Sequence, residues 1–500
     1  MLNKIVLFFN QRFSELDARS LAGFRMILGA SILWNLIIYR IPAVGKYYNN
    51  PLLVPDETIA DYYGPPLPIF SLTDSDLWYY LLMGVMVMAA SSMIVGWKTR
   101  WMVGILFVLM GSLTTTNPYL SHGVEYLEET ALFWSFFLPM DRCWSLRTAH
   151  HKNFDRLEGI ASFGLLLQLF LIYFSSWLFK NGAVWKEGRV LEIVAQDLIH
   201  ADTLLEWLSE YPSILQVMTY IGFGLEILIS LFLLVGIWKK TWRIYAALSI
   251  VLLHFSMTAL LDVGTFIIVG VGFAIVLLPD HFWKFIGKSW VFIPTDIIAS
   301  NFSKSKKNNW LTLGLLLAML CVLRSNLHSW TKDTYISPVL TSLPFSDPVL
   351  EKQIPDPGIF TGFWHQSWRF FAHNIYADLG DFMFVGHDEN GRMYDLASGS
   401  VISDAVNKAG HWTYLPDNNY QGAEFIFGVY FKFYHHRFPE SSKAQWLRLK
   451  LDEFTADHED VLLKRAEIWQ IERTYQVQKE VVLSDHYFLL SSHKVGELED

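Results

Sequence analysis

The sequence predicts an all-α polytopic membrane helix bundle of about nine spans, followed by a small C-terminal α+β extracytoplasmic domain. Two observations carry this prediction. Hydrophobic residues make up 52% of the 500 residues and charged residues only 17%, whereas an ordinary soluble domain is about 25% charged. The apolar residues also gather in long runs. The composition excludes a disordered protein, and a net charge of −9 without a basic block argues against a nucleic-acid partner.

The apolar runs approach the length of a membrane-spanning helix, which is about 20 residues for a hydrocarbon core of about 30 Å. The third, fourth, eighth and ninth runs are short and need flanking residues to span. We expect the helix bundle at residues 1–325, a linker at 326–358 and the extracytoplasmic domain at 359–500. The runs are residues 21–39, 77–96, 101–115, 124–139, 160–180, 214–238, 242–261, 263–278 and 310–323.

Loop charges set the expected orientation, because Lys and Arg accumulate on the cytoplasmic side of a membrane. Basic residues are concentrated in the N-terminal segment and in every second loop, and the intervening loops contain few of them. This alternation places the N-terminus in the cytoplasm and the chain after Leu323 outside. The basic residues on the cytoplasmic side include Arg19, Lys98, Arg100, Arg142, Arg147, Lys239, Lys240, Arg243, Lys304 and Lys306.

The N-terminal segment lacks the features of a cleaved signal peptide, because its apolar run at residues 5–9 is too short. Residues 2–13 are instead expected to form an interfacial helix. Cys143 falls in a cytoplasmic loop and Cys321 in the last span, so the outer domain holds no cysteine and no disulfide. This distribution favours a multi-pass protein of a bacterial envelope, located in the cell membrane.

The outer domain combines strand and helix signals. Residues 381–385 and 392–396 flank the turn from Asp388 to Gly391, which is a typical β-hairpin pattern. Residues 442–454 have the pattern of a helix and residues 466–475 that of a strand. The aromatic segment at 364–371 is suited to rest at a membrane interface.

Ionisable residues inside the spans are functional candidates, because each costs roughly 2.5–3.5 kcal/mol at the centre of a spanning helix. Arg25, near the cytoplasmic end of the first span, is expected to snorkel to the interface or to serve a function. Glu226 in the sixth span requires a partner or a polar cavity, as a structural ion pair or in a functional role. His254 in the seventh span suits an interhelical hydrogen bond or a functional role.

The outer end of the fourth span begins with His122, which is followed by Glu125, Glu128 and Glu129. Glu125 and one of the two later carboxylates share a helical face. These residues form either a solvated mouth of the bundle or part of a functional site.

Lys180 ends the apolar, aromatic run of the fifth span on the expected outer face. A lysine at such a position often snorkels to the interface. In the alternative interpretation its amine is desolvated, gives up its proton and acts as a base.

The sequence contains no motif of the common soluble enzymes. There is no phosphate-binding glycine loop, no His-Glu-x-x-His motif and no Cys-x-x-Cys pair. The neighbours His150 and His151, and likewise His435 and His436, lack the spacing of metal ligands to a second cluster. We therefore expect no metal site.

Several short segments together resemble one membrane-protein family. They are the Phe24-Arg25 pair of the first span, the block from Asn117 to Ser145, the run from Gln168 to Lys180 with the following Trp185 and Gly188, His254, and residues 366–371 and 388–399. These segments are similar to the HTTM domain proteins, relatives of the vitamin K-dependent gamma-carboxylase. The resemblance covers most of the chain.

The resemblance implies a site and a reaction. In the carboxylase, a lysine on the lumenal side deprotonates vitamin K hydroquinone. Oxygen then generates the strong base that takes a proton from a substrate glutamate, and carbon dioxide adds. Lys180 matches this lysine and His122 approximately matches its histidine partner. Trp185, Glu226 and His254 are the expected binding residues for a vitamin K-like quinol.

The chain departs from the carboxylase at Asn181, where the carboxylase has a second lysine, and we expect it to lack much of the large lumenal domain that holds a propeptide. The primary hypothesis is a carboxylase-like lyase or oxygenase that acts on a quinol or peptide at the outer membrane face. The alternatives are a non-catalytic partner in peptide or protein maturation or export, and a proton-coupled transporter. An enzyme requires Lys180 to face a pocket. A transporter requires Glu226 and His254 to face one continuous cavity, and a partner requires neither.

Overall fold

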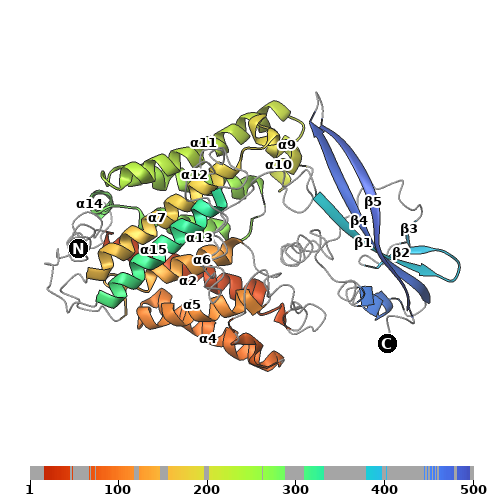
Figure 1. Ribbon diagram of the computed structural model, residues 1–500, viewed down its shortest axis with the longest axis horizontal. Coiled ribbons are helices and arrows are strands. Elements are labelled where there is room, and N and C mark those ends of the chain that lie inside the picture. Colours follow the sequence, from red (N-terminus) through yellow and green to blue (C-terminus); the bar gives the residue numbers. More distant parts are fainter. Residues whose placement is uncertain are drawn as a thin grey trace, which may run out of the picture.

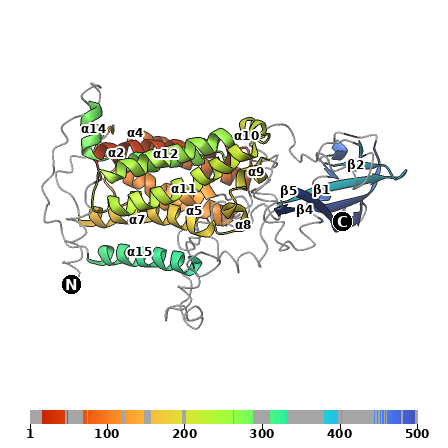
Figure 2. The same ribbon diagram turned by 90° about the horizontal axis from the view of Figure 1, so that it is seen from above.

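The computed structural model of the chain contains a helical bundle and a five-stranded sheet that lies beyond one end of the bundle (Figures 1 and 2). It describes residues 16–44, 69–146 except 74 and 117–122, 156–195, 202–287 except 262, 309–330, 379–402 except 397–400, and 461–495 except 478–480, with a few positions between these ranges. The expected interfacial helix at 2–13, residues 331–358 of the expected linker and the aromatic segment at 364–371 lie outside the described residues.

Helices of the described residues coincide with all of the predicted apolar runs. They are α2 (Ala18–Trp34, continued by the π-helix η1, Asn35–Arg40), α4 (Asp76–Val95), α5 (Thr99–Thr116), α6 (Gly123–Ser135), α7 (Arg156–Phe179), α11 (Pro212–Gly236), α12 (Trp242–Leu260), α13 (Phe266–Val276) and α15 (Asn309–Trp330). Three short helices that the sequence did not predict lie between α7 and α11. They are α8 (Ala183–Lys186), α9 (Val190–Val194) and α10 (Thr203–Leu208).

The length and composition of these helices support five membrane spans among the described residues. These are α2 with η1, α4, α7, α11 and α12. Helix α13 and α14 (Asp280–Gly287) are bent by 95° at their junction and add a sixth if the pair is one span. Length and composition do not support α5, α6 and α15 as spans in the same way. These helices correspond to three of the four apolar runs that are short in sequence. The helical bundle is confirmed, and nine spans remain a prediction.

The loops with the expected cytoplasmic charge meet at one end of the bundle. Arg19 at the start of α2 donates to Asp280 of α14 at 2.8 Å, and the rings of Trp144 and Trp283 lie 5.7 Å apart. Arg25 donates to the carbonyl of Trp144 and is fully buried, so it does not snorkel. Helices α8, α9 and α10 lie at the opposite end, which is the end nearest the sheet (Figures 1 and 2).

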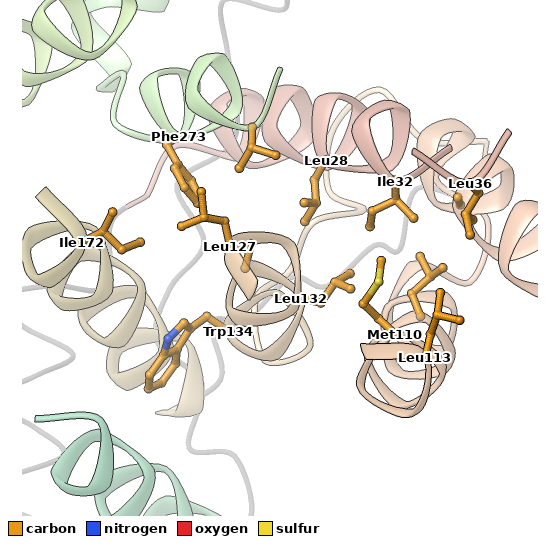
Figure 3. Close-up of a cluster of buried hydrophobic side chains, with 14 of the residues drawn as sticks. Leu28, Ile32, Leu36, Met110, Leu113, Leu127, Leu132, Trp134, Ile172 and Phe273 are labelled. Carbon is orange, nitrogen blue, oxygen red and sulfur yellow. The ribbon is translucent and has the colours of Figure 1, made fainter. Parts of the chain in front are cut away.

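The core of the bundle forms where α2 packs against its neighbours. Figure 3 shows Leu28 and Ile32 of α2 and Leu36 of η1 in a row, with Ile32 and Leu36 facing Met110 and Leu113 of α5. All five side chains are buried. The spacing of four residues places these three side chains of α2 and η1 on one face of the continuous helix, so a single apolar stripe joins the elements.

The C-terminal sheet is antiparallel, with strand order β3-β2-β1-β4-β5. Its strands are β1 (Leu379–Asp388), β2 (Met393–Asp395), β3 (Val401–Ile402), β4 (Leu463–Val477) and β5 (Val481–Lys494). The predicted hairpin is confirmed, because Val385 pairs with Asp395 and His387 with Met393. The Asp388 carboxylate accepts the backbone N–H groups of Asn390 and Arg392, each at 2.8 Å, and so fixes the turn.

A buried carboxylate links β1 and β4. Glu467 accepts a hydrogen bond from Trp469 Nε1 at 2.9 Å, and it lies 2.9 Å from His387 Nε2 and 3.0 Å from Arg465 Nε. Burial alone would raise the pKa of the Glu467 carboxyl. The contacts from His387, Trp469 and Arg465 outweigh burial, and the pKa lies below its ordinary value.

Glu467→Gln is expected to lower the free energy of local unfolding of β4 by about 1–2 kcal/mol at pH 7. A carboxyl with a lowered pKa stabilises the fold where it is ionised, so its contribution is lost as the pH falls through the folded-state pKa. The difference between the variant and the wild type should therefore shrink below about pH 4. Hydrogen exchange of the β4 amides measures the free energy of local unfolding in the variant and in the wild type. A stability difference that stays the same in acid would contradict a stabilising role of the ionised Glu467 carboxylate.

Candidate active site in the helical bundle

A cavity of about 110 Å³ lies where α11 packs against both α7 and α12, and α8 and α9 close it on one side. Four of the residues singled out in the sequence line it, namely Lys180, Trp185, Glu226 and His254. His122, the residue that the sequence analysis pairs with Lys180, lies outside the described residues. Most of the other lining residues are apolar, so these side chains form a small polar region in an apolar chamber.

Lys180 and Glu226 form an ion pair on the cavity wall. Lys180 Nζ lies 2.6 Å from Glu226 Oε1 and 2.7 Å from Oε2, and it donates to Ser176 Oγ at 2.7 Å. Ser176 in turn donates to Glu226 Oε1 at 3.0 Å. Lys180 is only 3% exposed, so the interpretation of a snorkelling anchor is wrong. Glu226 has the partner that its position in a span requires.

Local helix geometry explains how α7 contributes to this site. Tyr173, Ser176 and Lys180 are separated by three and four residues, which places them on one face of the helix. Lys180 directly follows the last residue of α7, and its backbone N–H donates to the carbonyl of Trp177. The side chain therefore continues the helical face into the cavity.

A second polar pair lies on the same cavity. The Tyr173 hydroxyl lies 3.0 Å from His254 Nε2, and the His254 ring stacks on Phe266 with 5.3 Å between centroids. A Cβ at Gly270 would come within 2.5 Å of the His254 ring, so only glycine lets α13 approach this closely. The hydrogen bond between helices that the sequence suggested for His254 is present.

Trp185 covers the amine from α8. Its ring centroid lies 5.0 Å from Lys180 Nζ, within the range of a cation–π contact. The aromatic face therefore attracts the lysine charge while excluding water from it. It also offers a flat surface against which an aromatic ligand could stack.

The acidic residues after His122 form a separate buried cluster. Glu125 pairs with Arg40 and accepts from Asn35 Nδ2 at 2.7 Å, and Glu128 accepts from Ser31 Oγ at 2.6 Å. The three carboxylates at 125, 128 and 129 are at most 2% exposed, so the alternative of a solvated mouth is wrong. None of the three lines the cavity of Lys180.

Tyr173 and Ser176 are functional candidates that the sequence reasoning missed. Each is a weak signal alone, because tyrosine and serine are common in apolar helices. Their spacing with Lys180 was the available signal, since a polar stripe on one face of an apolar helix predicts a polar partner or cavity.

The ion pair can take up a proton. A proton moved along the 2.6 Å hydrogen bond converts ammonium and carboxylate into amine and carboxylic acid, and the pair stays neutral. The amine can then accept a proton from a hydroxyl group in the cavity. Both groups are buried, so charge formed beside them is stabilised mainly by the protein and less by solvent.

Comparison with known proteins identifies the family. The sequence profile of the HTTM domain matches residues 13–281, more than half of the chain and all of the polar residues of the cavity. Searches of the curated proteins and of the solved structures return no significant match. The long apolar helices agree with a membrane protein. The resemblance is confirmed over residues 13–281, and the chain belongs to the HTTM domain family.

Proposed function

We propose that this HTTM-family membrane protein is an enzyme that takes a proton from a hydroxyl group of a lipid-soluble quinol bound beside Lys180. One observation carries the proposal: a buried lysine–glutamate pair lies on the wall of a mostly apolar cavity inside the helical bundle. Ion pairs that only join helices have no need of a cavity, and strongly buried ionisable groups in a cleft favour catalysis.

The residues present suit a ligand of this class. A hydroquinone supplies an acidic aromatic hydroxyl group. The apolar side chains of the cavity would hold its ring, with Trp185 as a stacking surface. Lys180 with Glu226, and Tyr173 with His254, provide two polar points for oxygen atoms. The volume of about 110 Å³ is several times the roughly 10–15 Å³ that a single water needs.

The proton transfer uses both members of the pair. In the neutral form of the pair, the Lys180 proton resides on Glu226, and the amine accepts the hydroxyl proton. The pair then holds one more proton than before, as an ammonium beside a carboxylic acid. The ammonium stabilises the negative charge left on the oxygen. A peptide or protein would be the substrate of any later step at this face.

A transporter is the second candidate, because Glu226 and His254 line one cavity. Both groups are already engaged, Glu226 with Lys180 and His254 with Tyr173. Polar groups that already have partners on one cavity wall favour an enzyme over a proton conduit.

The proposal places the cavity toward the extracytoplasmic side of a bacterial cell membrane, with the N-terminus in the cytoplasm. The loop charges support this orientation. In a Cys143→Ser, Cys321→Ser background, Ser209→Cys, at the exposed residue that follows α10, should react with an impermeant maleimide in intact cells. Lys239→Cys, also exposed, should react only after permeabilisation. The reverse pattern would overturn the orientation.

The experiment that tests the function is spectroscopic. Purified protein is mixed with 1-naphthol, a stable bicyclic aromatic alcohol whose absorption shifts to longer wavelength on ionisation. The wild type is expected to bind the anion and Lys180→Met the neutral alcohol. Neutral alcohol in both would overturn the proposal.

A further inference from the structure

The cavity is only partly covered between α11 and α12. Gly222, Ser256 and Met257 line the cavity and are each half-buried, whereas Glu226 and His254 are buried. A side chain built at Gly222 would meet no atom within 4 Å. The glycine therefore leaves open space at the cavity wall.

These three residues border a single gap. Helices α11 and α12 are antiparallel and joined at one end, where a Cβ at Gly236 would lie 2.9 Å from the side chain of Arg243. Residue 222 of α11 is as many residues away from Gly236 as residue 257 of α12 is from Arg243. Gly222 and Met257 consequently lie at the same height along the pair.

The gap faces the outer surface of two membrane-spanning helices. Large apolar side chains are exposed on that surface, among them Ile221 and Leu228 of α11 and Leu252 and Phe255 of α12. Such a surface meets lipid acyl chains in a bilayer. The gap therefore leads from the cavity into lipid.

We propose that this gap is a lateral opening that holds the hydrocarbon chain of a membrane-dissolved ligand whose polar head lies at Lys180 and Glu226. The chemistry of the head rests on the proposed function. A hydrocarbon chain suits the opening because Gly222, Ser256 and Met257 carry no charge. The missing Cβ at Gly222 lets the hydrocarbon chain of the ligand lie against the backbone of α11, and the flexible Met257 side chain adapts to the shape of the ligand.

The test uses the full-length protein in lipid nanodiscs and a photoreactive probe, hexadecanol with a diazirine next to its hydroxyl group. In the wild type, illumination should label the α11 and α12 peptides that contain Glu226 and His254. Gly222→Phe fills the gap and should lower labelling of these two residues at least tenfold. Labelling of Leu228 on the outer surface should stay the same.

Gly224→Phe is the matched control, because Gly224 lies on the same helix, also meets no atom within 4 Å and does not line the cavity. It should label like the wild type. Ser256→Phe serves as a second blocking variant if Gly222→Phe does not fold. Undiminished labelling of Glu226 and His254 in a folded blocking variant, or no such labelling in the wild type, would overturn the opening. Failure of 1-naphthol to ionise would overturn the head-group chemistry and leave the labelling result intact.

Discussion

Lys180→Arg is expected to lower the turnover of menadiol, followed as oxygen uptake, at least a hundredfold at unchanged abundance in the membrane. Arginine retains the positive charge and can still pair with Glu226, so the architecture of the site is kept. The guanidinium does not give up its proton near neutral pH and cannot accept one from a ligand. General-base catalysis contributes about 10²–10⁴-fold, which sets the size of the loss.

Lys186→Arg is the matched control, because Lys186 is an exposed lysine of the neighbouring helix α8 and does not line the cavity. It should leave turnover unchanged. Wild-type turnover by Lys180→Arg would mean that a fixed charge at this position is sufficient. The non-catalytic reading of the protein would then be the better one.

Glu226→Gln is expected to destabilise the helical bundle by about 3–5 kcal/mol, because it leaves the buried Lys180 ammonium without its counter-charge. The double variant Lys180→Met, Glu226→Leu should recover most of this loss, because an apolar pair can replace a buried ion pair at little cost. It should remain inactive, because it has no proton acceptor. Thermal unfolding in detergent and menadiol turnover separate the two effects.

Glu192→Gln provides the comparison for this experiment. Glu192 pairs with Arg189 at 2.6 Å in a partly exposed setting, where an ion pair contributes at most about 1 kcal/mol. A small effect there and a large one at Glu226 would reflect burial. A double variant that is active would show that the Lys180–Glu226 pair serves only to hold α7 and α11 together.

The sequence predicts the helices well, because length and apolarity decide which segments cross a bilayer. It also identifies Lys180, Glu226 and His254 by the cost of an ionisable group in a span. The contact between Lys180 and Glu226 could not be derived, since it depends on how α7 packs against α11. The same holds for the burial of Glu125, which depends on the position of Arg40 at the end of η1.

Short and weakly patterned elements are where prediction from sequence failed. Helices α8, α9 and α10 have four to six residues, too few to be stable without tertiary contacts. Val190 and Ile193 of α9 are buried with Leu205 of α10, so packing and not local propensity forms these turns. Strand β5 was missed because Ser484 and Asp485 interrupt its apolar alternation, and its pairing with β4 supplies the missing order.

The absorption spectrum of bound 1-naphthol tests the central claim most directly, since it reports where the hydroxyl proton resides and requires no knowledge of the complete reaction. Purified wild-type protein in nanodiscs at pH 7 should bind 1-naphthol with the long-wavelength spectrum of the anion. Lys180→Met, in which both the amine and its charge are gone, should bind it with the spectrum of the neutral alcohol. If the wild type also binds only the neutral alcohol, the Lys180–Glu226 pair does not act as a base and the account is contradicted.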